Sequence, residues 1–94
     1  MEIKGIIWID EIIEKLAIKH NVSQNEVLEI LIGQPHFRFV EKGHRRRENV
    51  YAALGQTKTG RYLVILFVHK KDGRAMILSA RNMTSSERRR YAER

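Results

Sequence analysis

The feature that most constrains the fold is an apolar run in the middle of the chain, Arg61–Lys70 (RYLVILFVHK). Successive side chains of a strand point to opposite faces, and in this run both faces are apolar. Continuous apolarity of this kind is typical of a central strand in a sheet that is covered on both sides. Asp72-Gly73 follows, a strong hairpin signal, and leads into a second predicted strand over Ala75–Ala80. The sequence therefore predicts a sheet organised around this hairpin.

Helix signals lie on both sides of the hairpin. Ser23 stands three residues before Glu26, which is the spacing of a capping box, and Thr84 stands three residues before Glu87. Apolar residues at helical spacing also follow Asp10, which we interpret as a helix N-cap. The predicted helices cover Asp10–His20, Ser23–Ile32 and a terminal segment from Thr84 through Tyr91.

The remaining segments predict strands. Two lie over His36–Glu41 and Val50–Gln56, and a short apolar one lies over Met1–Trp8. The resulting order is βααββββα, which is typical of an α+β fold with a largely antiparallel sheet. A chain of 94 residues is long enough for one modest core, so we expect a single domain over residues 1–94.

Charge is distributed unevenly along the chain. Residues 1–41 hold four basic and seven acidic side chains, whereas residues 42–94 hold fourteen basic and four acidic ones. A basic half of this kind is typical of polyanion binding, because each neutralised phosphate releases counterions. Solubility alone is the other interpretation. We therefore expect the basic half to bind RNA or DNA.

Composition excludes several classes of site. The chain has no cysteine, which rules out disulfides, thiolate metal sites and cysteine catalysis. Its six glycines form no phosphate-binding loop motif, and its four histidines form no HxH or HExxH pair, so we expect neither a nucleotide cofactor nor a metal. No apolar run is long enough for a membrane span, which predicts a cytoplasmic protein without a membrane partner.

Residues that could carry chemistry are densest in Gly43–Tyr51 (GHRRRENVY), a predicted loop and strand start. His44 and Glu48 are residue types that move protons in RNA cleavage, where the 2′-hydroxyl loses a proton and the leaving 5′-oxygen gains one. Tyr51 is a further candidate proton donor. The alternative is a solvated loop in which Glu48 pairs with a neighbouring arginine. Candidate phosphate ligands are the arginines that follow His44, namely Arg45, Arg46 and Arg47.

Other basic side chains flank the predicted strands. Lys70 falls on the same face as the apolar residues before it, so we expect it at the rim of an apolar surface. Arg81 precedes the capped terminal helix, whose N-terminus attracts anions, which predicts a catalytic phosphate contact. The alternative is that Arg81 pairs with Glu87 or Glu93 and only fixes that helix. Further candidate RNA contacts are Lys58, Arg61 and Arg74.

Four short motifs follow one another along the chain: Leu54-Gly55, Gly60–Val64 (GRYLV), Ile77–Arg81 (ILSAR) and Glu87–Tyr91 (ERRRY). Trp8, Asp10 and Lys19–Val22 (KHNV) add weaker matches. In this order and spacing the chain resembles the BrnT toxins, the ribonuclease partners in BrnT–BrnA toxin–antitoxin pairs. The resemblance implies a RelE-like fold, RNA as substrate and a BrnA-like antitoxin as partner.

The chain departs from that family pattern at basic positions. The family often has arginines where Val50 and Met76 stand, and a threonine and an arginine near Val68 and Lys70. Either the active site is shifted toward His44, Arg45 and Lys70, or nuclease activity is weakened or lost.

Two classes of function follow. The first is an endoribonuclease toxin that cleaves RNA by metal-independent attack of the 2′-hydroxyl. The second is a non-catalytic nucleic-acid-binding module, either a degenerate toxin or a small regulator. A basic face that meets only an acidic protein is a third interpretation.

The predicted helices also bear on assembly. The two N-terminal helices can cover one face of the sheet, but the central strand is apolar on both. We expect the terminal helix to cover part of the second face, and an antitoxin or a second copy of the chain, as a homodimer, to cover the remainder.

Overall fold

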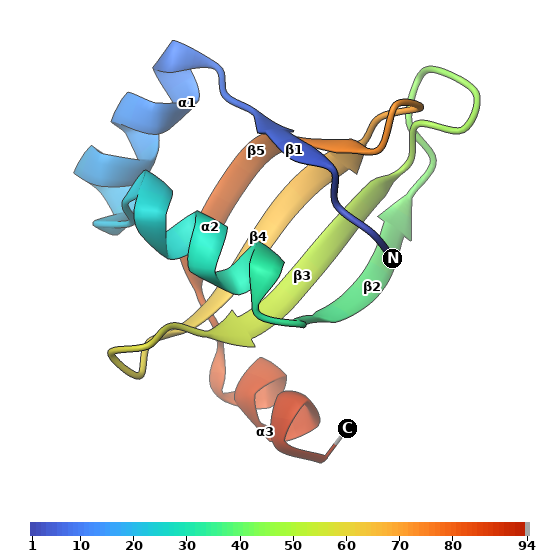
Figure 1. Ribbon diagram of the computed structural model, residues 1–94. Coiled ribbons are helices and arrows are strands. Elements are labelled where there is room, and N and C mark those ends of the chain that lie inside the picture. The colour runs from blue at the N-terminus through green and yellow to red at the C-terminus, as the bar shows by residue number, and fades with distance from the viewer. Residues whose placement is uncertain (94) are drawn as a thin grey trace.

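A computed structural model describes residues 1–93 and contains a five-stranded sheet with helices on both faces (Figure 1). The predicted order βααββββα and the α+β class are confirmed. The elements are β1 (Gly5–Ile7), α1 (Asp10–Lys15), the π-helical continuation η1 (Leu16–His20), α2 (Gln24–Ile32), β2 (His36–Glu41), β3 (Val50–Gln56), β4 (Tyr62–His69), β5 (Arg74–Asn82) and α3 (Ser85–Glu93).

The sheet has the strand order β1-β5-β4-β3-β2. Strands β2 to β5 form an antiparallel meander, with Val50 opposite Val68 in the β3–β4 pair. The first strand lies at the far edge, where it pairs with β5 in parallel and sets Gly5 opposite Arg74. The predicted hairpin between β4 and β5 forms around Gly73, whose φ of +92° favours glycine. The largely antiparallel sheet is therefore confirmed, with one parallel edge.

The main core lies between the sheet and the N-terminal helices. Side chains of β4 at Leu63, Ile65 and Phe67 are completely buried there. Arg61 joins the helices to the sheet, because its guanidinium donates to the Glu26 carboxylate at 2.9 Å and to a backbone oxygen at the end of η1. Helix residues packed into this core are Leu16, Val27, Ile30 and Leu31.

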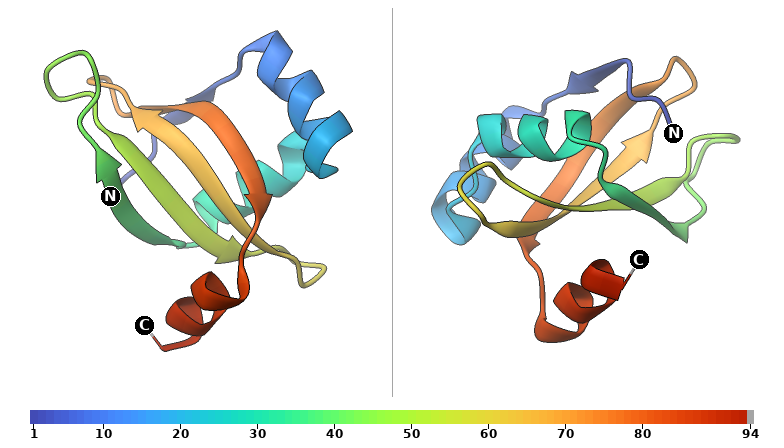
Figure 2. Two further views of the ribbon diagram at one scale, coloured as in Figure 1. Left: turned by 180° about the vertical axis from the view of Figure 1, so that it is seen from behind. Right: turned by 60° about the horizontal axis from the view of Figure 1, so that its bottom comes forward.

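The opposite face of the sheet, which we call the open face, carries a second, smaller cluster around Ala52, Leu54, Val64 and Met83. Helix α3 lies on this side, as Figure 2 shows. The Tyr91 ring packs edge-on against Tyr62, and the Arg88 guanidinium lies 4.2 Å from the centre of the Tyr62 ring. As expected, the terminal helix covers only part of the open face.

Both predicted capping boxes form. Ser23 and Glu26 exchange hydrogen bonds at the start of α2, and Thr84 and Glu87 do so at the start of α3. The predicted N-cap at Asp10 is wrong, because Ile9 holds that position and Asp10 is the first helical residue. Its negative charge in the first turn still favours the helix dipole. Within residues 1–93, no helix has the length and apolar character needed to cross a membrane.

Candidate functional site

The loop between β2 and β3, residues 42–49, has a defined shape. Gly43 lies so close to the backbone carbonyl of Glu48 that a side chain at this position would overlap it. The Glu48 amide donates to the Arg45 carbonyl at 3.0 Å, and Arg47 adopts a left-handed conformation with φ of +67°. These constraints fold the loop back over the open face and set the position of His44.

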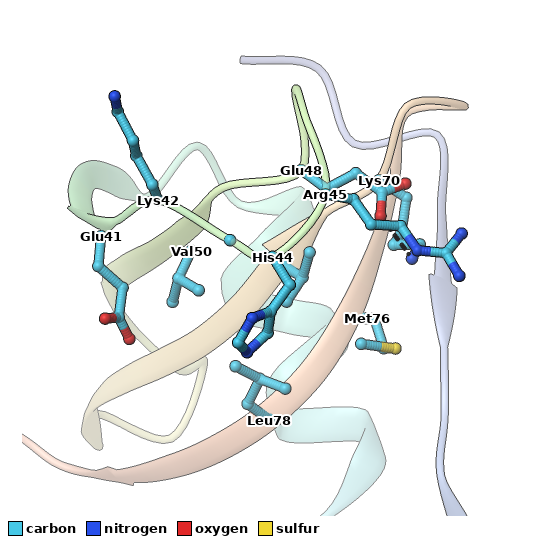
Figure 3. A pocket seen from close by; sticks show the side chains of 11 residues that line it. Glu41, Lys42, His44, Arg45, Glu48, Val50, Lys70, Met76 and Leu78 are labelled. Carbon is cyan, nitrogen blue, oxygen red and sulfur yellow. Dashed lines mark hydrogen bonds and ion pairs between the residues drawn. The ribbon is translucent and has the colours of Figure 1, made fainter.

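The loop lines one side of a pocket of about 470 Å³, which lies at the end of the open face that α3 leaves uncovered. Figure 3 shows the His44 side chain reaching from the loop toward Leu78. On one rim Arg45, Glu48 and Lys70 lie close together, and Glu41 and Lys42 line the pocket on the other side. The floor is apolar and comes from three strands: Val50, Val68, Met76 and Leu78.

Glu48 is buried and organises the charged rim. Its carboxylate accepts a hydrogen bond from Lys70 Nζ at 2.9 Å and another from the Lys71 amide at 3.3 Å. The Lys70 ammonium is the main cause that lowers the pKa of Glu48, and the charge of Arg45 adds to it. A carboxylate held ionised in this way is a weak proton acceptor. The ion-pair partner of Glu48 is Lys70 and not a neighbouring arginine. At this position Glu48 can fix the place of the Lys70 ammonium group.

Tyr51 lies on the other side of the sheet. It follows Val50 in β3, so strand alternation turns it toward the N-terminal helices. Its ring stacks with Phe67 and meets Phe39 edge-on, with ring centres 6.1 and 5.8 Å apart. The structure thus separates Tyr51 from His44.

The resemblance seen in the sequence motifs agrees with a comparison against protein-family models. Residues 8–87 match the family model described as ribonuclease toxin, BrnT, of type II toxin–antitoxin system. The chain belongs to the BrnT family. A ribonuclease toxin of a type II system implies a cognate antitoxin as the partner of this BrnT chain. A comparison with curated proteins finds no match.

Arg81 is not part of the pocket in this BrnT chain. Its guanidinium binds the Glu87 carboxylate through two hydrogen bonds of 2.7 and 2.9 Å, which is the alternative considered from the sequence. Arg81 faces Val64, six residues before Lys70, a separation of about 20 Å along a strand. The pair anchors the first turn of α3, because Glu87 also completes the capping box.

The Arg81–Glu87 pair predicts a pH-dependent stability. The Arg81 guanidinium lowers the pKa of Glu87 from 4.5 to about 2, so the pair stabilises the fold above pH 4.5 and loses this effect as the pH falls toward 2. We expect Glu87→Gln to cost about 1 kcal/mol at pH 7 and to approach the wild type near pH 2. Thermal melts from pH 7 to pH 2 measure this difference. Glu93→Gln on the same helix is the control, and melting curves that shift in parallel for both variants would contradict the assignment.

The other predicted RNA contacts are spread over the BrnT chain. Arg46 and Arg47 are exposed in the loop beside the pocket. Arg61 forms an ion pair with Glu26, and Arg74 forms one with Asp72 at 2.8 Å in the β4–β5 turn. Lys58 is exposed in the β3–β4 turn, at the opposite end of the strands. Of the predicted site, the structure brings together His44, Arg45, Glu48 and Lys70.

Sequence reasoning placed Lys70 at the rim of an apolar surface, but it did not identify the pocket or the set of residues that forms its floor. Strand alternation already placed Val68 on the face of Lys70, but the partner of Val68 on β3 depends on register. That register sets Val50 of β3 opposite Val68 on one edge of β4, and Met76 of β5 opposite Val68 on the other edge, so all three lie on the open face.

Among residues 1–93, no three histidine, aspartate or glutamate side chains gather as a group that could hold a metal ion.

Proposed function

We propose that this BrnT chain is an endoribonuclease that cleaves RNA by metal-independent attack of the 2′-hydroxyl, and that the pocket under the 42–49 loop is its active site. The observation that carries the proposal is the position of His44. It faces a pocket whose rim holds the cations Arg45 and Lys70. Histidine is the side chain best suited to accept and donate protons near neutral pH.

The proposed reaction uses these side chains as follows. His44 accepts the proton of the 2′-hydroxyl, and the oxygen attacks the adjacent phosphorus. A bond forms between the 2′-oxygen and phosphorus, while the bond to the 5′-oxygen breaks. Lys70 and Arg45 stabilise the charge on the phosphate oxygens, and Lys70 is the proposed proton donor to the leaving 5′-oxygen. The products are a 2′,3′-cyclic phosphate and a 5′-hydroxyl.

Glu48 has a positioning role in this proposal. Its ion pair with Lys70 fixes the direction of the ammonium group, and its bond to the Lys71 amide ties the β4–β5 turn to the 42–49 loop. This arrangement holds the proposed phosphate ligand before RNA binds, which is the kind of preorganisation that stabilises a transition state.

The same surface bears on protein partners. An apolar floor beside charged groups is the kind of patch that a partner covers. We propose that the cognate antitoxin covers it, with a second copy of the chain as the alternative.

The experiment that tests the proposed activity is cleavage of single-stranded RNA in EDTA. We expect cleavage to persist, and the new ends to be 2′,3′-cyclic phosphates and 5′-hydroxyls. RNA that stays intact at every protein concentration, with no growth arrest on induction, would refute a nuclease. Salt-dependent RNA binding by the wild type without any cleavage, unchanged by His44→Ala or Glu48→Ala, would instead favour the non-catalytic binding module.

A further inference from the structure

We infer that the apolar floor of the pocket is a nucleobase subsite, which holds the base of the nucleotide whose 2′-hydroxyl attacks. The inference rests on the proposed function and specifies the part of RNA that the pocket recognises. It starts from a mismatch between the floor and the rim. A site that binds only phosphate needs cations and amides, whereas this pocket places apolar side chains beneath them.

The size and composition of the pocket fit one unpaired base. Its volume of about 470 Å³ lies within the range of about 300–1,000 Å³ that is typical of sites for small organic ligands. Pockets of that kind are mostly apolar with a few convergent polar groups at one side. The floor residues Val50, Val68, Met76 and Leu78 are all partly exposed, so they offer contact area to a ligand.

The order of groups across the pocket fits one nucleotide. Arg45 and Lys70 lie on one rim, the His44 ring reaches over the centre, and Leu78 lies beneath that ring (Figure 3). A ribose beside His44 with its phosphate at the cationic rim directs its base onto the floor. This pose also brings the 2′-hydroxyl to the imidazole.

The floor determines what the subsite can distinguish. Its four side chains carry no strong hydrogen-bond donor or acceptor, so they contact a base through shape and apolar area. We therefore expect the floor itself to add little preference among the four bases. We also expect a strong preference for single-stranded RNA, because a paired base cannot leave its stack without cost.

The test compares two RNA oligonucleotides that differ in one base. The second lacks the base on the 5′ side of the cleaved phosphate but keeps the ribose. The wild type should cleave the abasic RNA about tenfold more slowly or worse, which is the scale for losing a buried apolar group. Met76→Phe, which fills the floor, should slow cleavage of the complete RNA to a similar degree and add little further loss on the abasic RNA.

Controls separate the subsite from general damage. Leu28→Phe enlarges an exposed side chain on α2 and should leave both rates unchanged. Leu78→Phe replaces Met76→Phe if thermal melting shows that the latter does not fold. The subsite would be overturned if the wild type cleaved the two RNAs at equal rates. It would also be overturned if Met76→Phe slowed cleavage of both RNAs by the same factor. It is also overturned if the filled variant cleaves RNA normally and only escapes the antitoxin, since the floor then binds protein.

A binding measurement covers the case in which the wild type cleaves no RNA, which refutes the proposed function by itself. Titration calorimetry with adenosine 3′-monophosphate then tests the subsite alone. At least tenfold weaker binding to Met76→Phe than to the wild type supports a base-binding floor. Equal affinities, or no binding to the wild type, overturn it.

Discussion

Replacement of His44 by alanine should lower the rate of RNA cleavage by about a hundredfold or more, which is the usual contribution of one proton-transferring side chain. The side chain is exposed and lies over the pocket, so its removal should leave the melting temperature unchanged. Single-turnover cleavage of a short RNA, with protein in excess, measures the chemical step separately from binding. A thermal melt of the same sample measures the fold.

His36→Ala is the matched control for this variant. His36 is also exposed, but it lies at the start of β2, at the opposite end of the strand from the 42–49 loop. It should cleave RNA at the wild-type rate. Equal rates for His44→Ala and the wild type would remove His44 from the mechanism, and equal losses in both variants would point to a general effect of charge or stability.

The second large effect is expected at Lys70. Lys70→Met keeps the length of the side chain but removes the ammonium group, so a cation at the developing phosphate charge is lost. Such groups contribute about a hundredfold to a thousandfold in rate. The variant should also melt at a lower temperature, because the buried carboxylate of Glu48 loses its ion pair. Cleavage rates corrected for the folded fraction separate the two effects.

The neighbouring lysine offers a control of equal charge. Lys71 is exposed, and only its backbone amide contacts Glu48, so Lys71→Met keeps that hydrogen bond. This variant should reduce RNA affinity slightly, because one surface charge is lost. The rate at which bound RNA is cleaved should stay unchanged. Similar cleavage losses in both lysine variants would mean that Lys70 acts through general attraction of RNA and not at the phosphate.

Local sequence signals predicted most of the fold, because they act between residues that are close in the chain. The capping boxes at Ser23 and Thr84 each connect residues three positions apart, and the Asp72-Gly73 turn joins adjacent strands. These features need no knowledge of the tertiary structure. The N-terminal strand was predicted as a segment, but its parallel pairing with β5 depends on packing that local patterns do not encode.

The candidate site was harder to predict, because it depends on how distant strands align. Alternation alone separates Tyr51 from Val50, but only the fold reveals which side holds the pocket. A bulge opposite Leu66 and Phe67 shifts the alternation in β5, so that Ile77 and Ala80 both face the main core. Arg81 had two plausible partners from sequence, a phosphate and a glutamate, and the structure contains its bidentate pair with Glu87.

The pairing of β1 with β5 has a consequence for how the chain folds. Gly5 lies opposite Arg74, so the sheet is completed by a contact between residues almost 70 positions apart along the chain. The meander from β2 to β5 has shorter loops and can form first, whereas β1 can join the sheet only after β5 is in place. Closure of so long a loop is slow, and we expect folding in about milliseconds to seconds rather than microseconds. A ribosome that is still synthesising β5 therefore carries a chain whose main core is incomplete.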